Sequence, residues 1–283
     1  GPRGVGKTTT ARILAKAINC TDTSSSEPCN KCESCIAFNE GRSYNIHELD
    51  AASNNSVENI RELVDQVRIP PQMGSYSVYI IDEVHMLSQA AFNAFLKTLE
   101  EPPSYAIFIL ATTEKNKILP TILSRCQVYD FNRISVNDTV NHLKSIAEKE
   151  RITAEEDALN VIAVKSDGGM RDALSTFDQV VSFCGKNITY KNVVENLNIL
   201  DYDYYFKLTQ TCFEMQIPSA LVLVNEILSK GFEAGNIISG LLEHARDLLV
   251  CKNPETAMLL NVGAGIREKY LKQAEIIPQD FLL

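Results

Sequence analysis

The sequence predicts an α/β fold with a parallel sheet in its first half, followed by a region built from helices. A glycine-rich loop, "GPRGVGKT" at 1–8, runs into a helical pattern. Short apolar runs at 77–82 and 106–113 end in polar residues, and amphipathic helical segments lie between the runs. Strands that alternate with helices pair in parallel, because each helix carries the chain back to the start of the next strand.

The composition is that of an ordinary globular chain. Of its 283 residues, 45% are hydrophobic and 22% are charged, which leaves room for two or three domains. The apolar runs are too short to span a membrane, so we expect a cytoplasmic protein. A net charge of −9 argues against a stand-alone nucleic-acid binder, although local contacts with DNA stay possible.

Residues 1–8 match the phosphate-binding pattern G-x-x-x-x-G-K-[ST]. In this pattern backbone N–H groups surround phosphates, Lys7 reaches the β- and γ-phosphates, and Thr8 binds Mg²⁺. Ala11, Leu14, Ala15 and Ile18 have the spacing of one face of the helix that follows. The residues expected to bind ATP and Mg²⁺ here are Gly1, Pro2, Arg3, Gly4, Val5, Gly6, Lys7, Thr8 and Thr9.

An acidic pair, Asp82 and Glu83, follows the first of these apolar runs, in the segment "SVYIIDEVHML" at 77–87. The run predicts a buried parallel strand, and α/β folds bind ligands at the ends of such strands. We expect Asp82 to hold Mg²⁺ and Glu83 to polarise the water that attacks the γ-phosphate. A solvated turn is the usual alternative, but the phosphate loop favours the catalytic interpretation. His85 is expected to be a packed side chain without a role.

The run "AIFILATT" at 106–113 predicts a third strand, with Thr112 and Thr113 at its carboxyl end. A threonine there could present a hydroxyl to the γ-phosphate, or could belong to an ordinary strand exit. Helices are expected at 55–67, capped by Ser53 or Asn54, and at 88–103, capped by Ser88. The apolar face of the second predicted helix comprises Phe92, Phe95, Leu96 and Leu99.

Four cysteines follow the first helix with the spacing C-x8-C-x2-C-x2-C: Cys20, Cys29, Cys32 and Cys35. Two thiolates separated by two residues can bind one tetrahedral ion from a single turn. Disulfides are disfavoured without a secretion signal, and the polar neighbours of these cysteines do not suit a core. The cluster therefore predicts a closed, structural Zn²⁺ site that catalyses nothing.

Two arginines stand near predicted helix ends. Arg125 ends the helix that Pro120 begins, where a cation suits the helix dipole, so a simple capping role is possible. Arg171 lies in the first turn of a helix that follows Gly168 and Gly169. A cation is unfavourable in that position, which suggests an anionic partner such as an ATP phosphate.

Together these motifs resemble one family, the γ/τ subunits of the bacterial clamp loader. This family is part of the DNA polymerase III holoenzyme and of the AAA+ ATPase superfamily. The resemblance is strong over residues 1–185, and the cysteine spacing is its most discriminating feature. The matching segments are "GPRGVGKTTTARILAKAINC", "ELDAASNNSVENIREL", "VYIIDEVHMLSQAAFNAFLKTLEEPP", "FILATTEKNKILPTILSRC" and "DGGMRDALSTFDQ".

The resemblance implies a role for each matching residue. Lys7, Thr8 and Asp82 would bind ATP and Mg²⁺, Glu83 would be the catalytic carboxylate, and Thr113 the sensor hydroxyl. Arg171 would be a second sensor, and Arg125 a finger that reaches the ATP of a neighbouring subunit. The implied partners are the other subunits of a hetero-pentameric ring, the sliding clamp and primer-template DNA. A further C-terminal region could bind the polymerase core.

The resemblance also implies three domains. These are an AAA+ core at 1–133 with the zinc knuckle at 20–35, a helical lid at 134–186, and a helical oligomerisation collar at 187–283. The segment that contacts adenine is expected before Gly1, and the collar is expected to be cut short. The residues themselves predict a strand-like segment at 126–131, near the end of the core. In the lid they predict a helix cap at Ser135 and a capping box formed by Thr153 and Glu156.

The expected function is ATP-driven loading of the sliding clamp onto primed DNA. No carboxylate constellation for nucleotidyl transfer is identifiable, so this is not expected to be the polymerising chain. One alternative is a scaffold that binds nucleotide without turnover, and another is a AAA+ helicase-type motor. Residues 51–60, "AASNNSVENI", could contact DNA phosphates or could simply cap their helix.

Overall fold

The computed structural model describes residues 1–22, 24–71, 74–260 and 262–282. Thr23, within the expected knuckle, lies outside the described residues. The chain forms two compact units, Gly1–Arg133 and Ile134–Leu283.

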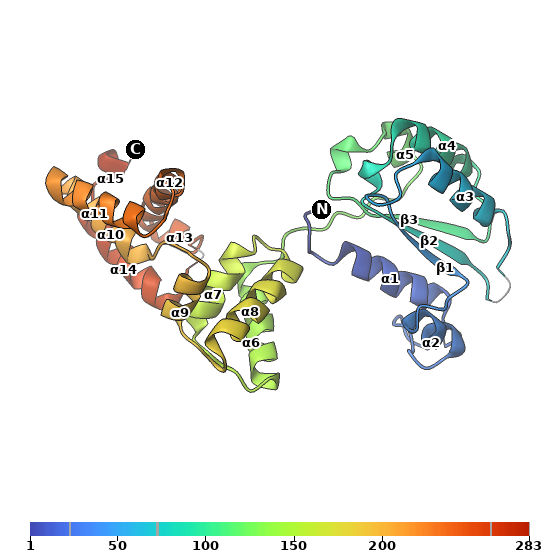
Figure 1. The fold of residues 1–283 in the computed structure, drawn as a ribbon, viewed down its shortest axis with the longest axis horizontal. Coiled ribbons are helices and arrows are strands. Elements are labelled where there is room, and N and C mark those ends of the chain that lie inside the picture. The colour runs from blue at the N-terminus through green and yellow to red at the C-terminus, as the bar shows by residue number, and fades with distance from the viewer. Residues whose placement is uncertain (23, 72–73, 261, 283) are drawn as a thin grey trace. The chain divides into compact units, whose positions relative to one another are not determined.

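The first unit is built on a parallel sheet of three strands in the order β1-β2-β3 (Figure 1). The strands are β1 (Ile46–Asp50), β2 (Ser77–Asp82) and β3 (Ala106–Leu110). Val78 to Ile81 of β2 are at most 1% exposed, as expected for a central strand covered on both faces. The parallel sheet is confirmed. Strand β1 was not expected, because "IHELD" has too few apolar residues to resemble a buried strand.

Helices cover both faces of this sheet (Figure 1). On one face, α1 (Lys7–Ile18) and α2 (Glu33–Asn39) enclose a core that contains Ala15, Phe38 and Ile80. On the other face, α3 (Val57–Val67) and α4 (Gln89–Glu100) pack over Tyr79 and Ile81. The expected apolar face of α1 is only partly correct. Ala11 and Ala15 are buried, but Leu14 is 47% exposed.

Two predicted helix caps have different outcomes. Ser88 caps α4 as expected, since its hydroxyl accepts a hydrogen bond from the backbone of Ala91. The predicted caps of α3 are wrong, because the cap is Ser56, which accepts from the backbone of Asn59. Ser53 instead donates to the carboxylate of Asp50 at 2.7 Å. The loop after β1 is therefore folded back on its own strand end, and the helix begins later.

After β3 the chain forms short turns and α5 (Pro120–Leu123). Pro120 begins this helix as expected, because a proline at the first helical position loses no hydrogen bond. Residues 126–131 form no strand in the structure, contrary to the expectation. Their residue types favour extended backbone, but a strand also requires a hydrogen-bonded neighbour, and β3 is paired only with β2 among the described strands.

The second unit begins with a helical cluster around Leu143, Ile162 and Phe177. Its helices are α6 (Val136–Lys149), α7 (Glu156–Lys165), α8 (Met170–Cys184) and α9 (Tyr190–Asn196). Two short strands, β4 (Thr153–Ala154) and β5 (Asn187–Ile188), pair in parallel. Ser135 caps α6 as predicted. The predicted capping box is wrong, because Thr153 belongs to β4 and α7 begins only after Glu155.

The rest of the second unit is also helical, as predicted. It contains α10 (Tyr202–Phe213), α11 (Ile217–Ser229), α12 (Ala234–Cys251), α13 (Pro254–Ala257), α14 (Ala264–Ile276) and α15 (Gln279–Leu282). Buried His244 on α12 faces the Tyr270 hydroxyl at 2.9 Å and the Gln273 side-chain oxygen at 3.0 Å, both on α14. Among the described helices, none combines the length and the apolar character that a membrane span needs.

Phe95 should contribute strongly to the stability of the first unit's core. It is fully buried on α4, and its ring meets that of Phe108 edge to face at 5.2 Å. Phe95→Ala should lower the free energy of unfolding by about 3–5 kcal/mol. Tyr44→Ala, at a residue that is 86% exposed, should change it by less than about 0.5 kcal/mol. Urea denaturation followed by circular dichroism measures both, and equal effects would contradict this packing.

Candidate active site

The phosphate loop leads into α1 through a left-handed glycine. Gly6 precedes the helix with φ 93°, a conformation that a side chain would strain. The first N–H groups of α1 therefore remain open to an anion, as at other helix N-termini. The ammonium group of Lys7 donates to the backbone oxygens of Gly1 (3.1 Å) and Pro2, so it lies over its own loop.

Thr8 and Asp82 come together although 74 positions separate them. The Thr8 hydroxyl donates to Oδ2 of Asp82 at 2.7 Å. Asp82 is the last residue of β2, and α1 packs against that strand. A hydroxyl and a carboxylate are both oxygen ligands of the kind that Mg²⁺ prefers. The residues that the sequence assigned to Mg²⁺ thus share one place in the structure.

Glu83 points away from the Asp82 contact. It has a left-handed backbone (φ 47°), and its N–H donates to Oδ1 of Asp82 at 2.9 Å. Its own carboxylate reaches the end of β3, where Oε2 accepts from the N–H (3.1 Å) and the hydroxyl (2.9 Å) of Thr113. The sharp turn gives the two adjacent carboxylates separate partners. Asp82 faces the phosphate loop, and Glu83 faces the predicted sensor.

His85 and Glu114 join this group. The sequence predicted His85 only as a packed side chain and gave no signal for Glu114. The imidazole of His85 is 7% exposed, with Nδ1 at 3.2 Å from Oε2 of Glu83 and Nε2 at 3.4 Å from Oε1 of Glu114. The Thr112 hydroxyl lies 3.0 Å from the same Nδ1. The available signal was the position of His85, two residues after Glu83. A single sequence does not reveal which strand lies beside it.

The two predicted arginines are both exposed at the surface of their own units. Arg125 follows α5, donates to the backbone oxygen of Thr121 at 2.7 Å, and forms an ion pair with Glu100 at 3.1 Å. Its side chain is 40% exposed, so the guanidinium lies at the surface. Arg171 is exposed in the first turn of α8, in the second unit.

The four cysteines of the predicted zinc knuckle gather as expected. The sulfur atoms of Cys20, Cys29, Cys32 and Cys35 all lie within 4.8 Å of one another. Zn–S bonds of about 2.3 Å in a tetrahedron place sulfur atoms about 3.8 Å apart, so the donor set is compatible with zinc. Backbone N–H groups of Lys31 and Cys32 also point at the Cys29 sulfur, at 3.4 and 3.3 Å.

The thiols of this cluster differ in their environments. A hydrogen bond from the Thr21 backbone lowers the pKa of Cys32 to about 6, whereas burial raises the pKa of Cys35 to about 12. A hydrogen bond from the backbone of Cys29 lowers the pKa of Cys20. Metal binding requires thiolates, so an ion in the cluster would have to displace the proton of Cys35.

The knuckle is attached to the phosphate-loop helix. Phe38 of α2 is 9% exposed, and the guanidinium of Arg12 on α1 lies 5.2 Å from the centre of its ring. Lys16 of α1 donates to the side chain of Asn39 at 2.7 Å. These contacts join the cysteine cluster to the core of the first unit. The cluster lies at the C-terminal end of α1, away from the phosphate loop.

Two family models match the chain. Residues 1–135 match the model described as DNA polymerase III, delta subunit. Residues 138–186 match the ATPase lid domain of the DNA polymerase III clamp loader subunit.

The similar solved structures include a mutant of RuvB from Thermotoga maritima. It has a TM-score of 0.50 and 19% sequence identity, over 76% of this chain and 67% of that one. At this identity the likeness concerns the fold alone, and it agrees with the predicted α/β fold class.

Curated relatives extend the match over most or all of the chain. DNA polymerase III subunit tau of Bacillus subtilis is 42% identical over 282 residues, which cover 100% of this chain but 50% of that protein. DNA polymerase III subunit gamma of Buchnera aphidicola is 41% identical over 253 residues, which cover 89% of this chain and 70% of that protein. The chain thus spans half to about two thirds of these relatives, and it belongs to the γ/τ subunit family of DNA polymerase III.

Proposed function

We propose that this chain is the ATPase part of a clamp-loader subunit, in which ATP binding and hydrolysis drive the loading of a sliding clamp onto primed DNA. The observation that carries the proposal is the convergence of the phosphate loop, Asp82, Glu83 and Thr113 at one edge of the sheet. The names of the matching family and relatives support the clamp-loading role.

The chemistry assigned to this site is hydrolysis of the γ-phosphate. Lys7 neutralises phosphate charge, and Thr8 with Asp82 would hold Mg²⁺. Glu83 takes a proton from water while the water oxygen attacks the γ-phosphorus, and the bond to the β–γ bridging oxygen breaks to leave ADP and phosphate. Thr113, within hydrogen-bond reach of Glu83, would sense the γ-phosphate, as Arg171 would from the lid.

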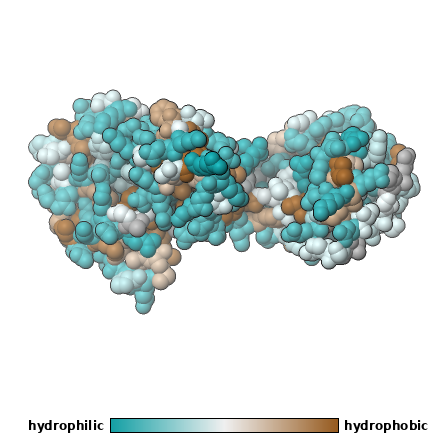
Figure 2. Space-filling view, turned by 90° about the horizontal axis from the view of Figure 1, so that it is seen from below, coloured by the Kyte–Doolittle hydropathy of each residue, from teal (hydrophilic) through white to brown (hydrophobic). Residues whose placement is uncertain are grey.

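The proposed partners are other clamp-loader subunits, the clamp and primer-template DNA. The collar at 187–283 supports association with neighbouring subunits, because apolar side chains of α11 and α12 are exposed: Ile217, Leu221, Val222, Ile238 and Leu242. Separate brown, hydrophobic areas are visible on the surface in Figure 2. Exposed apolar surface of this kind typically marks protein interfaces.

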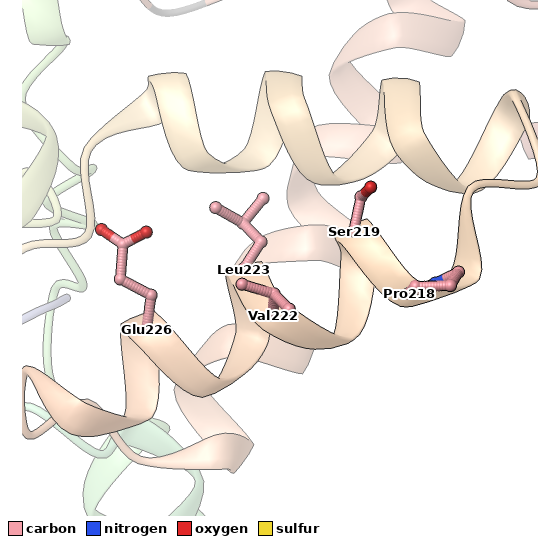
Figure 3. Close-up of a pocket in the computed structure, with 5 residues that line it drawn as sticks. All are labelled: Pro218, Ser219, Val222, Leu223 and Glu226. Atoms are coloured by element: carbon pink, nitrogen blue, oxygen red, sulfur yellow. The ribbon is translucent and has the colours of Figure 1, made fainter.

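A shallow hollow of about 350 Å³ on α11 adds to this surface (Figure 3). Pro218, Ser219, Val222, Leu223 and Glu226 line it. Glu226 at its end accepts a hydrogen bond from Tyr204 of α10 at 2.8 Å. A hollow bordered by apolar side chains and a fixed carboxylate suits a protruding side chain of a neighbouring subunit better than a buried cofactor.

The scaffold alternative, in which nucleotide binds without turnover, is less well supported. Lys7, Asp82, Glu83 and Arg125 are all present, and the first three lie in or beside the same edge of the sheet. A subunit without turnover would have no use for Glu83 beside a sensor threonine.

Zinc is proposed as a structural cofactor of the knuckle. One Zn²⁺ per chain should remain after exhaustive desalting, because four thiolates fill its coordination shell. Cys32→Ser should lower the zinc content and the thermal stability of the knuckle while ATP affinity is retained. Cys212→Ser, at an exposed cysteine of α10, should leave zinc content unchanged. Metal analysis near zero in reduced, folded wild-type protein would refute the zinc site.

Lys7 and Glu83 should fail at different stages of the cycle. Lys7→Ala removes a cation from the phosphates and should weaken ATP binding roughly 10- to 100-fold. Glu83→Gln should keep binding near normal and lower turnover at least about 10²-fold. Equilibrium binding of a fluorescent ATP analogue and single-turnover hydrolysis separate the two. Glu62→Gln, on the exposed face of α3, is the control, and equal loss of affinity in both variants would contradict the assignment.

Arg125 should act on the ATP of a neighbouring subunit. Arg125→Ala should bind ATP normally as a monomer. In the assembled ring, its turnover stimulated by clamp and primed DNA should fall about 10³- to 10⁵-fold. Arg68→Ala, at another surface arginine, is the control.

Mixed rings give the decisive comparison for Arg125. Each mutant chain keeps the residue that the other lacks. An interface is therefore complete where the Glu83→Gln chain supplies Arg125 and the Arg125→Ala chain supplies Glu83. Mixed rings should therefore regain part of the activity. If mixing restores nothing, and Arg125→Ala impairs dilute monomer equally, the residue acts within its own chain or only caps α5.

A further inference from the structure

His85 is the described side chain that joins the largest number of groups around Glu83. It lies in the short turn Val84–Met86 directly after the catalytic carboxylate, and its ring is 7% exposed. The ring is in contact distance of three residues from two segments: Glu83 after β2, and Thr112 and Glu114 after β3. A histidine that only filled core space would not need carboxylate oxygens at both ring nitrogens.

The contacts to Glu83 all involve one of its two carboxylate oxygens. Oε2 of Glu83 lies 3.2 Å from Nδ1 and also accepts both donors of Thr113, so all three interactions end on the same oxygen. Among the described residues, no hydrogen bond reaches the other oxygen, Oε1. A carboxylate that is held through one oxygen presents the other in a fixed direction, which is what a base needs in order to meet an attacking water.

The far side of the ring is also held. Oε1 of Glu114 lies 3.4 Å from Nε2, and Lys117 donates to the same oxygen at 2.7 Å. This hydrogen bond from Lys117 lowers the pKa of Glu114. The N–H of Glu114 donates to the Thr112 hydroxyl at 3.0 Å, which fixes the loop that carries both residues.

We propose that His85 is a positioning residue for ATP hydrolysis: its ring, with Nδ1 toward the Thr112 hydroxyl and Oε2 of Glu83 and with Nε2 toward Glu114, holds the Glu83 carboxylate in place. The inference rests on the proposed function, since it assigns the base role to Glu83. It extends that function, because it places the direction of the base under the control of the loop after β3, which also carries Thr113.

Two conservative variants separate the two sides of the ring. The amide nitrogen of Asn can take the place of Nδ1, and that of Gln can take the place of Nε2. The full-length chain, assembled with its ring partners, clamp and primed DNA, should show kcat lowered roughly 10- to 100-fold in His85→Ala and His85→Gln. His85→Asn should retain kcat within about threefold of wild type, since it keeps a nitrogen at the position of Nδ1, toward Glu83. Affinity for the fluorescent ATP analogue should be unchanged in all three.

The controls distinguish failure of the inference from failure of the proposed function. His142→Gln, at an exposed histidine of α6, should behave as wild type. If Glu83→Gln abolishes turnover but His85→Ala does not, or if His85→Asn is as impaired as His85→Gln, the positioning role is overturned and the function stands. If Glu83→Gln itself leaves turnover intact, the function is wrong.

A measurement without catalysis covers the case in which these variants fold poorly. The nitrogen resonances of His85 can be compared between wild type and variants in chains with isotope-labelled histidine. Relative to wild type, the Nδ1 resonance should shift in Glu83→Gln, and the Nε2 resonance should shift in Glu114→Gln. If the Nδ1 resonance is the same in wild type and in Glu83→Gln, the proposal is overturned.

Discussion

The parallel pairing of β1, β2 and β3 is the constraint on which the rest of the first unit depends. Parallel strands end at one edge, and the register sets Asp50 of β1 opposite Asp82 of β2. β2 is apolar from Val78 to Ile81 because helices cover both of its faces. Its carboxylate, Asp82, therefore appears only where the strand ends, beside the phosphate loop. The position of the candidate active site follows from burial of the strand that precedes it.

The second decisive feature is the turn at Glu83. A left-handed backbone at a residue other than glycine is uncommon, and here it directs two consecutive carboxylates to different partners. Asp82 contacts the hydroxyl of Thr8, and Glu83 contacts the loop after β3. Separate partners suit the two roles proposed for these carboxylates, a metal ligand and a base. The hydrogen bond from Glu83 N–H to Asp82 helps to hold this conformation.

The cysteine knuckle holds together a segment that is too polar to form a hydrophobic core. Residues 20–35 are mostly polar and small, so they cannot bury enough apolar surface to fold alone. The four thiols gather this segment, and Phe38 of α2 joins it to the core beneath α1. A cysteine cluster compatible with zinc therefore stands in for a missing hydrophobic core, at the far end of the helix that follows the phosphate loop.

The sequence by itself determined the features that depend on neighbouring residues. The phosphate loop, the apolar strand β2, the caps Ser88 and Ser135 and the cysteine spacing are local signals, and the structure contains them as expected. Only the tertiary structure decided that "IHELD" is a strand, that Leu14 is exposed, and that Arg125 pairs with Glu100. It also decided that His85 faces Glu83 and Glu114. These outcomes depend on which distant segment lies alongside, and the packing free energy that selects that neighbour is not encoded in any short stretch of residues.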